Sequence, residues 1–322
     1  MNKTLRLSIL VAACLQVTAS FAQSYPTKPI RWIVPLPPGG GADIVARTVA
    51  AKLSIGLGQQ VVIENRGGGG TVIGAQAVAR AEPDGYTLLL SNATTHAINP
   101  VMVKNLPYDA IKDFAPVSLI ANLPIVLVTS PGMQAKNVAE LIAMARAKPG
   151  ELNFASSGNG SSLHLLGELL KLKAGVRMTH IPYKGAGPAV TALLGNEINF
   201  MFSSIPPILP HIKAQKVRAI AVATPKRSAL MPDVPTINES GIDGVYAYSW
   251  NGISAPAGTP ADIINRLNAE IVKTMTMQDV VATLGNQGAE AVSTTPAEFA
   301  AFIRAEITKY DQVVKASGAT ID

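Results

Sequence analysis

The segment 30–47 constrains the fold more than any other part of this 322-residue chain. Its apolar run Ile30–Val34 predicts a short buried strand, which prolines and glycines end before a helix expected to begin at Asp43. The three glycines Gly39–Gly41 let backbone N–H groups face a ligand, and a helix N-terminus favours an anion. A plain connection between strand and helix would need the same flexible residues, so the loop alone leaves both interpretations open.

Strands and helices alternate through the first hundred residues, which predicts an α/β fold with a parallel sheet and helices on both faces. Further strands are expected at 59–64 and 86–90. Because ligands bind beyond the carboxyl ends of the strands in such sheets, the loops 36–43, 67–71 and 91–96 should open on one edge.

A second strand, loop and helix N-terminus is expected at 152–174. The loop Ser156–Ser162 has four serines among its seven residues. Serine at a helix start is usually a cap, but hydroxyl groups at this density also suit the lining of an anion pocket. The apolar run 117–128 can carry the chain into this second unit, and a strand at 248–255 can return it. We therefore expect two lobes, 24–123 with 250–322 and 124–249, each a mainly parallel sheet flanked by helices.

Capping signals mark three later helices. Asn137 with Glu140 and Thr295 with Glu298 have capping-box spacing, and Pro260 is expected at the first helical position after Thr259.

Residues 1–22 have the pattern of a secretory signal peptide, with Lys3 and Arg6 before an apolar stretch and cleavage expected after Ala22. Cys14 lies in a sequence that resembles a lipoprotein cleavage box, but its apolar stretch would be very short, so soluble export is favoured. Since Cys14 is the single cysteine, the mature chain has no disulfide, no thiol chemistry and no cysteine–zinc site.

Composition excludes disorder and gives no support for nucleic-acid binding. Hydrophobic residues make up 48% of the chain and charged residues 15%, which provides for a proper core. Without the signal peptide, 25 basic side chains face 21 acidic ones, a balance too even to indicate nucleic acid as a partner.

Known catalytic and cofactor motifs are missing from the sequence. There is no Gly-Lys pair for a phosphate-binding loop, no complete dinucleotide fingerprint, and no Gly-x-Ser-x-Gly. The four histidines have no metal-ligand spacing, so we expect neither a metal nor a cofactor. His96 lies on a loop at the expected ligand edge and His164 in the first turn after the serine loop, whereas His180 and His211 are interpreted as structural.

Short motifs along nearly the whole mature chain are similar, in order and number, to those of one family, the Bug extracytoplasmic solute receptors of tripartite tricarboxylate transporters. They are Tyr25–Arg31, Val34–Asp43, Glu64–Arg66, Asp84–Leu88, Leu106–Asp109, Asp113–Val117, Gly158–Ser162, His180–Gly185, Pro232–Thr236 and Trp250–Gly252.

The resemblance implies a two-lobed periplasmic binding protein of the Venus flytrap type that is monomeric, closes on a ligand and is not an enzyme. It implies a carboxylate held by main-chain amides and ordered water at Leu36–Asp43 and Ser156–Ser162, and delivery to a membrane permease. Leu36 stands where an aromatic residue is expected and Ala42 where threonine is expected. Both lie in the ligand loop, so the ligand stays open among aliphatic, amino-acid and aromatic acids.

From the loops and the resemblance together we expect these ligand-binding residues: Leu36, Pro38, Gly39, Gly40, Ala42, Asp43, Ser91, Thr94, His96, Ser156, Ser157, Gly158, Gly160, Ser161, Ser162, Lys184, Gly185 and Ser203. Asp43 is most simply the N-cap of the first helix, since a carboxylate repels an anion, and Lys184 could supply positive charge. Two alternatives stay open: a receptor that signals to a membrane partner, and an exported enzyme with His96 or His164 as base.

Overall fold

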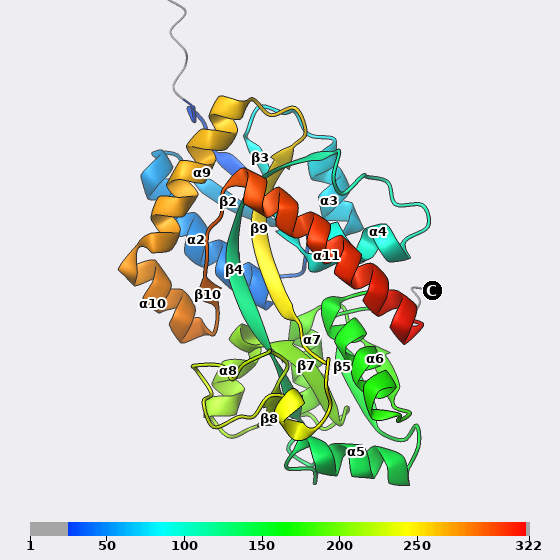
Figure 1. Ribbon diagram of the computed structural model, residues 1–322. Coiled ribbons are helices and arrows are strands. Elements are labelled where there is room, and N and C mark those ends of the chain that lie inside the picture. The colour runs from blue at the N-terminus through cyan, green and yellow to red at the C-terminus, as the bar shows by residue number, and fades with distance from the viewer. Residues whose placement is uncertain (1–24, 320–322) are drawn as a thin grey trace, which may run out of the picture.

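Two long strands, β4 (Phe114–Thr129) and β9 (Tyr248–Pro256), run antiparallel through the middle of the molecule and join its two lobes (Figure 1). The computed structural model describes residues 25–319, so the predicted signal peptide and Cys14 lie outside the described residues. β4 pairs with β9 as far as Pro124 and takes its partners in the second lobe from Ile125 onward. This change of partner lies next to the predicted lobe boundary at 123/124, which itself stays a prediction.

In the first lobe, β1 pairs in parallel with both β2 and β3, and β9 adds an antiparallel neighbour to β3. The short strand β10 pairs antiparallel with β4. The elements are β1 (Ile30–Val34), α2 (Gly41–Leu57), β2 (Val61–Asn65), α3 (Val72–Ala79), β3 (Thr87–Asn92), a π-helix (Thr94–Ile98), α4 (Asn99–Met102), α9 (Ala261–Thr276), α10 (Gln278–Gln287), β10 (Glu290–Ala291) and α11 (Pro296–Ser317).

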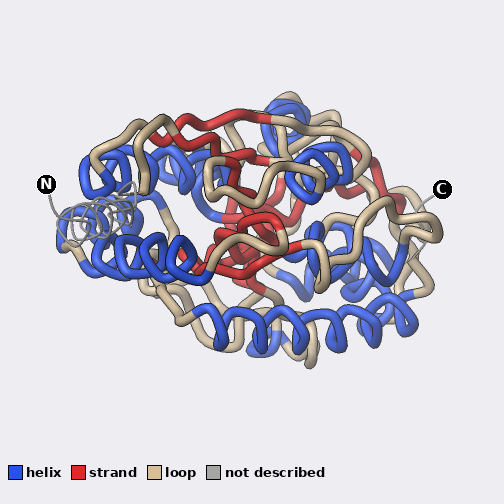
Figure 2. The backbone as a smooth tube through the Cα atoms, turned by 90° about the horizontal axis from the view of Figure 1, so that it is seen from above, coloured by secondary structure: helices blue, strands red, loops and turns tan. Residues whose placement is uncertain are grey.

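In the second lobe, β5 pairs in parallel with β6 and β7, while β4 pairs antiparallel with β7 and β8. The elements are α5 (Val138–Ala147), β5 (Asn153–Ser156), α6 (Ser162–Ala174), β6 (Thr179–Pro182), α7 (Ala186–Leu194), β7 (Phe200–Ser204), α8 (Ile205–Lys213), β8 (Arg218–Val222) and a 3-10 turn (Asn238–Ser240). Figure 2 shows the strands at the centre with helices around them. The two-lobed α/β class is confirmed, and the antiparallel pairs come from the strands that cross between lobes.

Each lobe has its own apolar core, and a further cluster joins them beside the crossing strands. There, Trp250 of β9 packs edge-on against Phe299 and Phe302 of α11, and Leu165 of α6 belongs to the same cluster. The Trp250 indole N–H donates to Glu306 Oε2 at 2.9 Å. The C-terminal helix thus packs against both lobes, and Trp250 is a packing residue.

The predicted helix starts are confirmed in two cases and shifted in two. The Asn137 and Thr295 side chains cap α5 and α11 as their spacing indicates. α9 begins one residue late, with Pro260 as its N-cap. The prediction that Asp43 is an N-cap is wrong: Gly40 is the N-cap of α2, because the Asp43 carboxylate reaches back from the third helical position to the Gly39 N–H.

Candidate ligand-binding site

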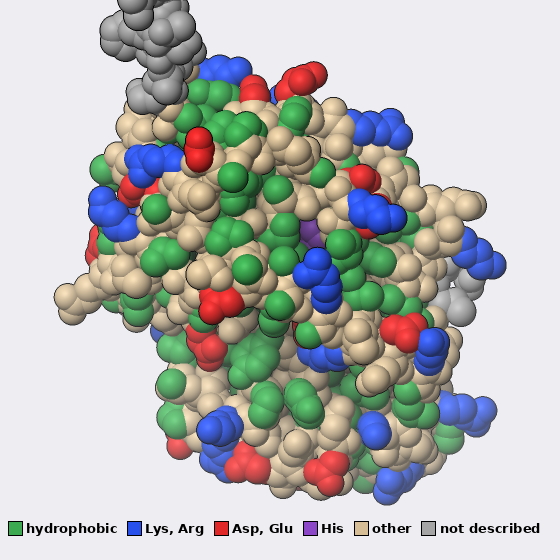
Figure 3. Space-filling view, turned by 45° about the horizontal axis from the view of Figure 1, so that its top comes forward, with side chains coloured by type: hydrophobic (Ala, Val, Ile, Leu, Met, Phe, Trp, Pro, Cys, Tyr) green, Lys and Arg blue, Asp and Glu red, His purple; other side chains and the backbone are tan. Residues whose placement is uncertain are grey.

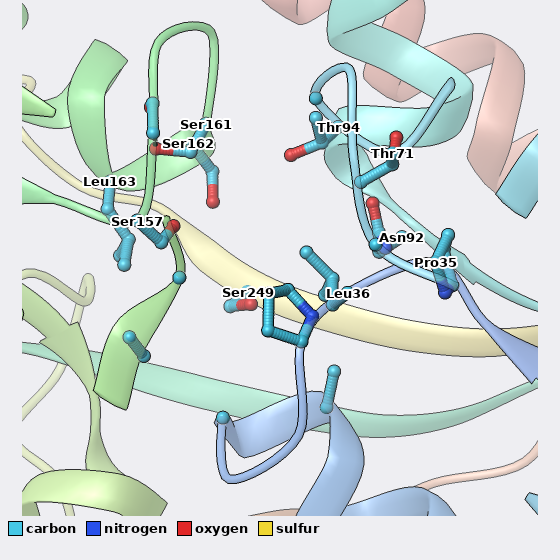
Figure 4. A pocket seen from close by; sticks show the side chains of 18 of the residues that line it. Pro35, Leu36, Thr71, Asn92, Thr94, Ser157, Ser161, Ser162, Leu163 and Ser249 are labelled. Carbon is cyan, nitrogen blue, oxygen red and sulfur yellow. Dashed lines mark hydrogen bonds between the residues drawn. The ribbon is translucent and has the colours of Figure 1, made fainter. Parts of the chain in front are cut away.

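A cavity of about 790 Å³ lies between the two lobes, at the ends of the strands in both. The first lobe contributes parts of the three loops expected at its sheet edge, 36–43, 67–71 and 91–96. The second lobe contributes residues 157–159 and 161–163 and the 183–186 turn. Figure 4 shows Ser157, Ser161 and Ser162 across the cavity from Thr71, Asn92 and Thr94. The two halves of the cavity therefore come from opposite lobes.

Five α-helices begin at this cavity. Their N-caps all line it: Gly40 of α2, Thr71 of α3, Ser161 of α6, Gly185 of α7 and Ser204 of α8. Only Ser161 of these five makes a side-chain capping bond. First-turn N–H groups have no partner within their helix, and the helix dipole adds positive potential there. In α3, however, the Val72 and Ile73 N–H groups donate to the Gly69 and Gly68 carbonyls, and in α8 Pro206 and Pro207 have no N–H, so α2, α6 and α7 are the main sources of first-turn donors. The cavity is thus built to receive a negative charge with main-chain donors.

Asp43 fixes the first loop from behind. Its carboxylate accepts from the Gly39 N–H at 3.0 Å and the Asn65 amide at 2.9 Å, and forms an ion pair with Arg47 at 3.0 Å. Burial alone would raise the pKa of this carboxyl, but the hydrogen bonds from Arg47, Gly39 and Asn65 bring it below the ordinary value. Asp43 borders the cavity, yet its negative charge is balanced by the ion pair with Arg47 and by the hydrogen bonds that it accepts within the protein.

Hydroxyl groups and histidines fix the second loop. Ser161 Oγ accepts from the His164 N–H at 3.2 Å and donates to the Gly158 carbonyl at 2.8 Å. Ser156 Oγ lies 2.7 Å from His180 Nε2, and the rings of His164 and His180 stack with centroids 3.9 Å apart. Burial and the neighbouring His164 lower the pKa of His180 to about 3, so the pair is neutral near pH 7.

Glycines allow the two lobes to approach closely beside the cavity. A Cβ at Gly40 would lie 3.8 Å from the Ala186 Cβ of the other lobe, and one at Gly185 would lie 3.1 Å from Pro37. Gly185 also has φ +107°, a conformation that favours glycine. The cavity walls are therefore backbone-lined where the lobes meet.

Comparison with known proteins decides the family. Residues 45–319 match the family described as tripartite tricarboxylate transporter family receptor. BugT of Bordetella pertussis is 41% identical over 301 residues, covering 93% of this chain and 92% of that protein. The chain belongs to this receptor family.

Solved structures of similar proteins show the same fold. A Rhodopseudomonas palustris protein solved with adipate has 35% identity and a TM-score of 0.90, covering 92% of this chain and 99% of its own. MatC from the same organism, with bound malate, has 33% identity and a TM-score of 0.85, covering 90% and 100%. Two other similar solved structures are described as a periplasmic transporter and as the periplasmic binding protein BugD. The family and its solved members are solute-binding receptors, so this chain is a receptor and not an enzyme.

Twelve of the predicted site residues line the receptor's cavity: Leu36, Pro38, Gly40, Ala42, Asp43, Thr94, Ser157, Gly158, Ser161, Ser162, Lys184 and Gly185. Six do not: Gly39, Ser91, His96, Ser156, Gly160 and Ser203. Polar atoms of these six are used inside the protein, as for Gly160, whose N–H donates to His164, and Ser203, whose hydroxyl donates to the Ser204 carbonyl.

His96, one of the two candidate bases of the enzyme alternative, is fully buried in the π-helix of the receptor. Its ring nitrogens lie 3.1 Å from the Ala110 carbonyl and 2.9 Å from Ser91 Oγ. Burial lowers the pKa of His96 to about 4, against a smaller opposing effect of the Ala110 hydrogen bond. It faces the interior rather than the ligand.

Sequence reasoning missed several residues that line the receptor's cavity, among them Asn65, Thr71, Asn92, Asn99, Tyr183, Ser204, Ser249 and Asn251. At two strand ends the expected residue was one position off, Ser91 for Asn92 and Ser203 for Ser204. Neighbouring strand residues point to opposite faces, so this shift changes the face. The start of a helix directly after Ser204 was the sequence signal that could have identified Ser204 as a cavity residue.

Charged side chains and metal-ligating side chains are sparse around the cavity. Lys184 lines it and is exposed. Within residues 25–319 no group of three or more His, Cys, Asp or Glu could hold a metal, and no helix there is long and apolar enough to cross a membrane. On the face in Figure 3, positive and negative side chains are interspersed. Main-chain donors are thus the main source of positive potential at the cavity.

Proposed function

We propose that this protein captures a small organic carboxylate between its lobes in the periplasm and delivers it to the membrane permease of a tripartite tricarboxylate-type transporter. The observation that carries the proposal is that, within residues 25–319, five helix N-termini meet at one cavity between the lobes, and that three of them, those of α2, α6 and α7, offer first-turn N–H donors. Each helix end contributes typically ~0.3–1 kcal/mol toward an anion, up to ~2 kcal/mol when partly buried. The adipate and malate in two similar solved structures are small carboxylates, which a cavity of about 790 Å³ is large enough to admit.

Main-chain donors, rather than a cation, are proposed to hold the carboxylate. Closure of the lobes removes water from the cavity, which strengthens the attraction between the helix ends and the ligand. Ligand binding shifts the balance between open and closed forms only through its preference for the closed form. The closed form then presents a surface that the permease can distinguish from the open one. Export through the predicted signal peptide, with cleavage after Ala22, is part of this proposal.

A thermal-shift screen of the mature protein, residues 23–322, tests the proposal. The panel holds aliphatic, amino-acid and aromatic acids, followed by calorimetry on any acid that raises the melting temperature. A ligand present at 100 times its Kd should add about 2.7 kcal/mol of stability. Absence of binding across all three groups of acids would contradict the proposal.

A glycine variant tests the use of main-chain donors. Gly40→Val places methyl groups between Gly40 and Ala186, over the N–H groups at the start of α2, and should weaken binding at least about tenfold, or ~1.4 kcal/mol. Gly285→Val is the matched control, because Gly285 lies on α10 with open space around its Cβ position. Equal affinity in the two variants would count against main-chain recognition at α2.

A further inference from the structure

Two of the asparagines that line the cavity have their amide N–H groups engaged by the protein. Asn65 donates to the Leu36 carbonyl at 3.1 Å and to Asp43 at 2.9 Å, and accepts from Arg47 at 2.8 Å. Asn99, which is 1% exposed, donates to the Gly70 carbonyl, Thr71 Oγ1 and Tyr108 OH at 2.9–3.2 Å. These side chains hold loops in place and have no amide N–H to spare for a ligand.

Asn92 and Asn251 differ from these two. They lie directly opposite each other on β3 and β9, so their side chains share one face of the sheet. Asn92 Oδ1 accepts from the Thr95 N–H at 2.9 Å, which leaves its Nδ2 as a donor without a partner. Asn251 has no partner for either Nδ2 or Oδ1. Since only an oxygen can accept from Thr95, the orientation of the Asn92 amide is fixed.

Both residues are buried, 7% exposed for Asn92 and 0% for Asn251, and both line the cavity. Buried polar groups are almost always paired, and leaving one unpaired is costly. The other described side chains with unpaired buried atoms do not line the cavity: Trp32, Thr129, Asn238, Glu270, Thr274 and Tyr310. The unpaired groups at the cavity thus come together at one pair of opposed residues.

The chemistry of this pair selects its partner. Together the two amides offer two NH₂ donor groups and one acceptor oxygen, and neither carries a charge. A second carboxylate on the ligand could accept from the donors but would leave Asn251 Oδ1 facing negative charge. A hydroxyl or carboxamide group both donates and accepts, and so can satisfy the pair. Figure 4 places Asn92 across the cavity from Ser157, Ser161 and Ser162, so a ligand can reach both sides.

We propose that Asn92 and Asn251 form a subsite for a neutral hydrogen-bonding group, so that the preferred ligand is a carboxylic acid with a hydroxyl or carboxamide group at a distance from the bound carboxylate. This inference rests on the proposed function, because it assumes that a carboxylate occupies the helix ends.

Calorimetry on the mature protein tests the subsite with matched acids of four, five and six carbons. Each set holds the unsubstituted monoacid, the terminal hydroxy acid, the terminal monoamide and the dicarboxylate. At one chain length the hydroxy acid or monoamide should bind about tenfold tighter than the monoacid and the dicarboxylate, the equivalent of one net hydrogen bond.

Asn251→Leu removes the polar atoms at similar size, and the preference for the hydroxy acid or monoamide should fall to within about twofold. Its melting temperature without ligand should not fall, because no protein partner loses a bond. Asn99→Leu is the matched control and should lower the melting temperature, since three acceptors lose their donor. If Asn251→Leu does not fold, Asn92→Asp tests the same subsite by replacing the donor Nδ2 with an oxygen.

The outcomes separate the two proposals. If acids bind but the dicarboxylate is tightest, or if the preference survives in both Asn251→Leu and Asn92→Asp, the subsite is wrong and the proposed function stands. If no acid binds to the unaltered protein, the proposed function fails and the subsite fails with it.

Discussion

The two loops that lead into α2 and α6 reach the same cavity with different chemistry. The first loop, Pro37–Asp43, caps its helix with glycine and is anchored by one buried carboxylate, Asp43. The second loop, Ser156–Ser162, caps its helix with a serine hydroxyl and is anchored by neutral groups, including the His164–His180 stack. Both solutions use side chains to hold the backbone and leave first-turn N–H groups for a ligand.

The comparison teaches that the residue type in a binding loop does not reveal its role. Asp43 borders an anion cavity, but its charge is balanced by Arg47 and by two N–H donors, so it supports the loop without repelling the ligand. Serine hydroxyls that suit an anion are partly used for the loop itself, as with Ser156. The two loops should therefore respond differently to substitution and to acid.

The largest expected effect is at Asp43. Asp43→Ala leaves Arg47, the Gly39 N–H and the Asn65 amide without their shared acceptor, and should cost about 3 kcal/mol of unfolding free energy. Urea denaturation measures this loss, and ligand affinity should fall with it because the loop loosens. Asp43→Asn keeps the size and one oxygen and should lose less. Stability equal to the unaltered protein would show that the loop is held by other contacts.

Much of the fold could be predicted from local patterns. The strands at Ile30–Val34 and Asn153–Ser156 follow from apolar runs ended by glycine or serine loops, and the helix starts after Asn137 and Thr295 follow from capping boxes. These features depend on a few neighbouring residues, so one sequence is enough to find them. The loops that form the cavity could be predicted for the same reason.

The parts that depend on strand register could not be predicted. Asn251 stood between Trp250 and Gly252 of a motif, and nothing in the sequence places it opposite Asn92. The need for glycine at position 41, the first residue of α2, also depends on tertiary contacts, because a Cβ there would lie 2.6 Å from Ser204 Oγ of the other lobe. Such long-range pairings decide which face a residue occupies.

The second expected effect is acid loosening of the second loop. The pKa of His180 is about 3 in the fold against 6.5 as its ordinary value, so the unfolded chain binds the proton more readily. The stability that neutral His180 contributes is complete above pH 6.5 and is lost as pH falls toward 3. Because the ring is partly exposed and its charge would be screened by solvent, about 1 kcal/mol should be gone at pH 5.

Urea denaturation of the unaltered protein and of His180→Phe at pH 7 and pH 5 measures this effect. The variant should lose about 1 kcal/mol less between the two pH values, because it has no imidazole to protonate at position 180. The Asp43 contribution follows a lower window: its pKa is depressed, so its stabilisation is lost only as pH falls below about 4. An unchanged pH dependence in His180→Phe would contradict the assignment of acid sensitivity to the second loop.

The third effect separates capping from ligand binding. Ser161→Ala and Asn137→Ala each remove an N-cap oxygen that accepts from the third residue of its helix, and each should cost ~1 kcal/mol of stability. Of the two helices α5 and α6, only α6 begins at the cavity, so only Ser161→Ala should also weaken ligand binding. Thermal denaturation with calorimetry on both variants measures the two effects. If both variants bind like the unaltered protein, the Ser161 hydroxyl has a structural role only.

The smallest effect is expected at Lys184, the exposed cation at the cavity. Its charge is exposed to water and screened by salt, so Lys184→Ala should weaken carboxylate binding by only ~0.2–1 kcal/mol, and less at high ionic strength. Calorimetry at two salt concentrations measures this difference beside Gly40→Val. If Lys184→Ala abolished binding while Gly40→Val spared it, the anion would be held by the lysine and not by the helix ends. The salt dependence would then be steep in the unaltered protein, whereas recognition by buried main-chain donors makes it shallow, because buried interactions are screened much less.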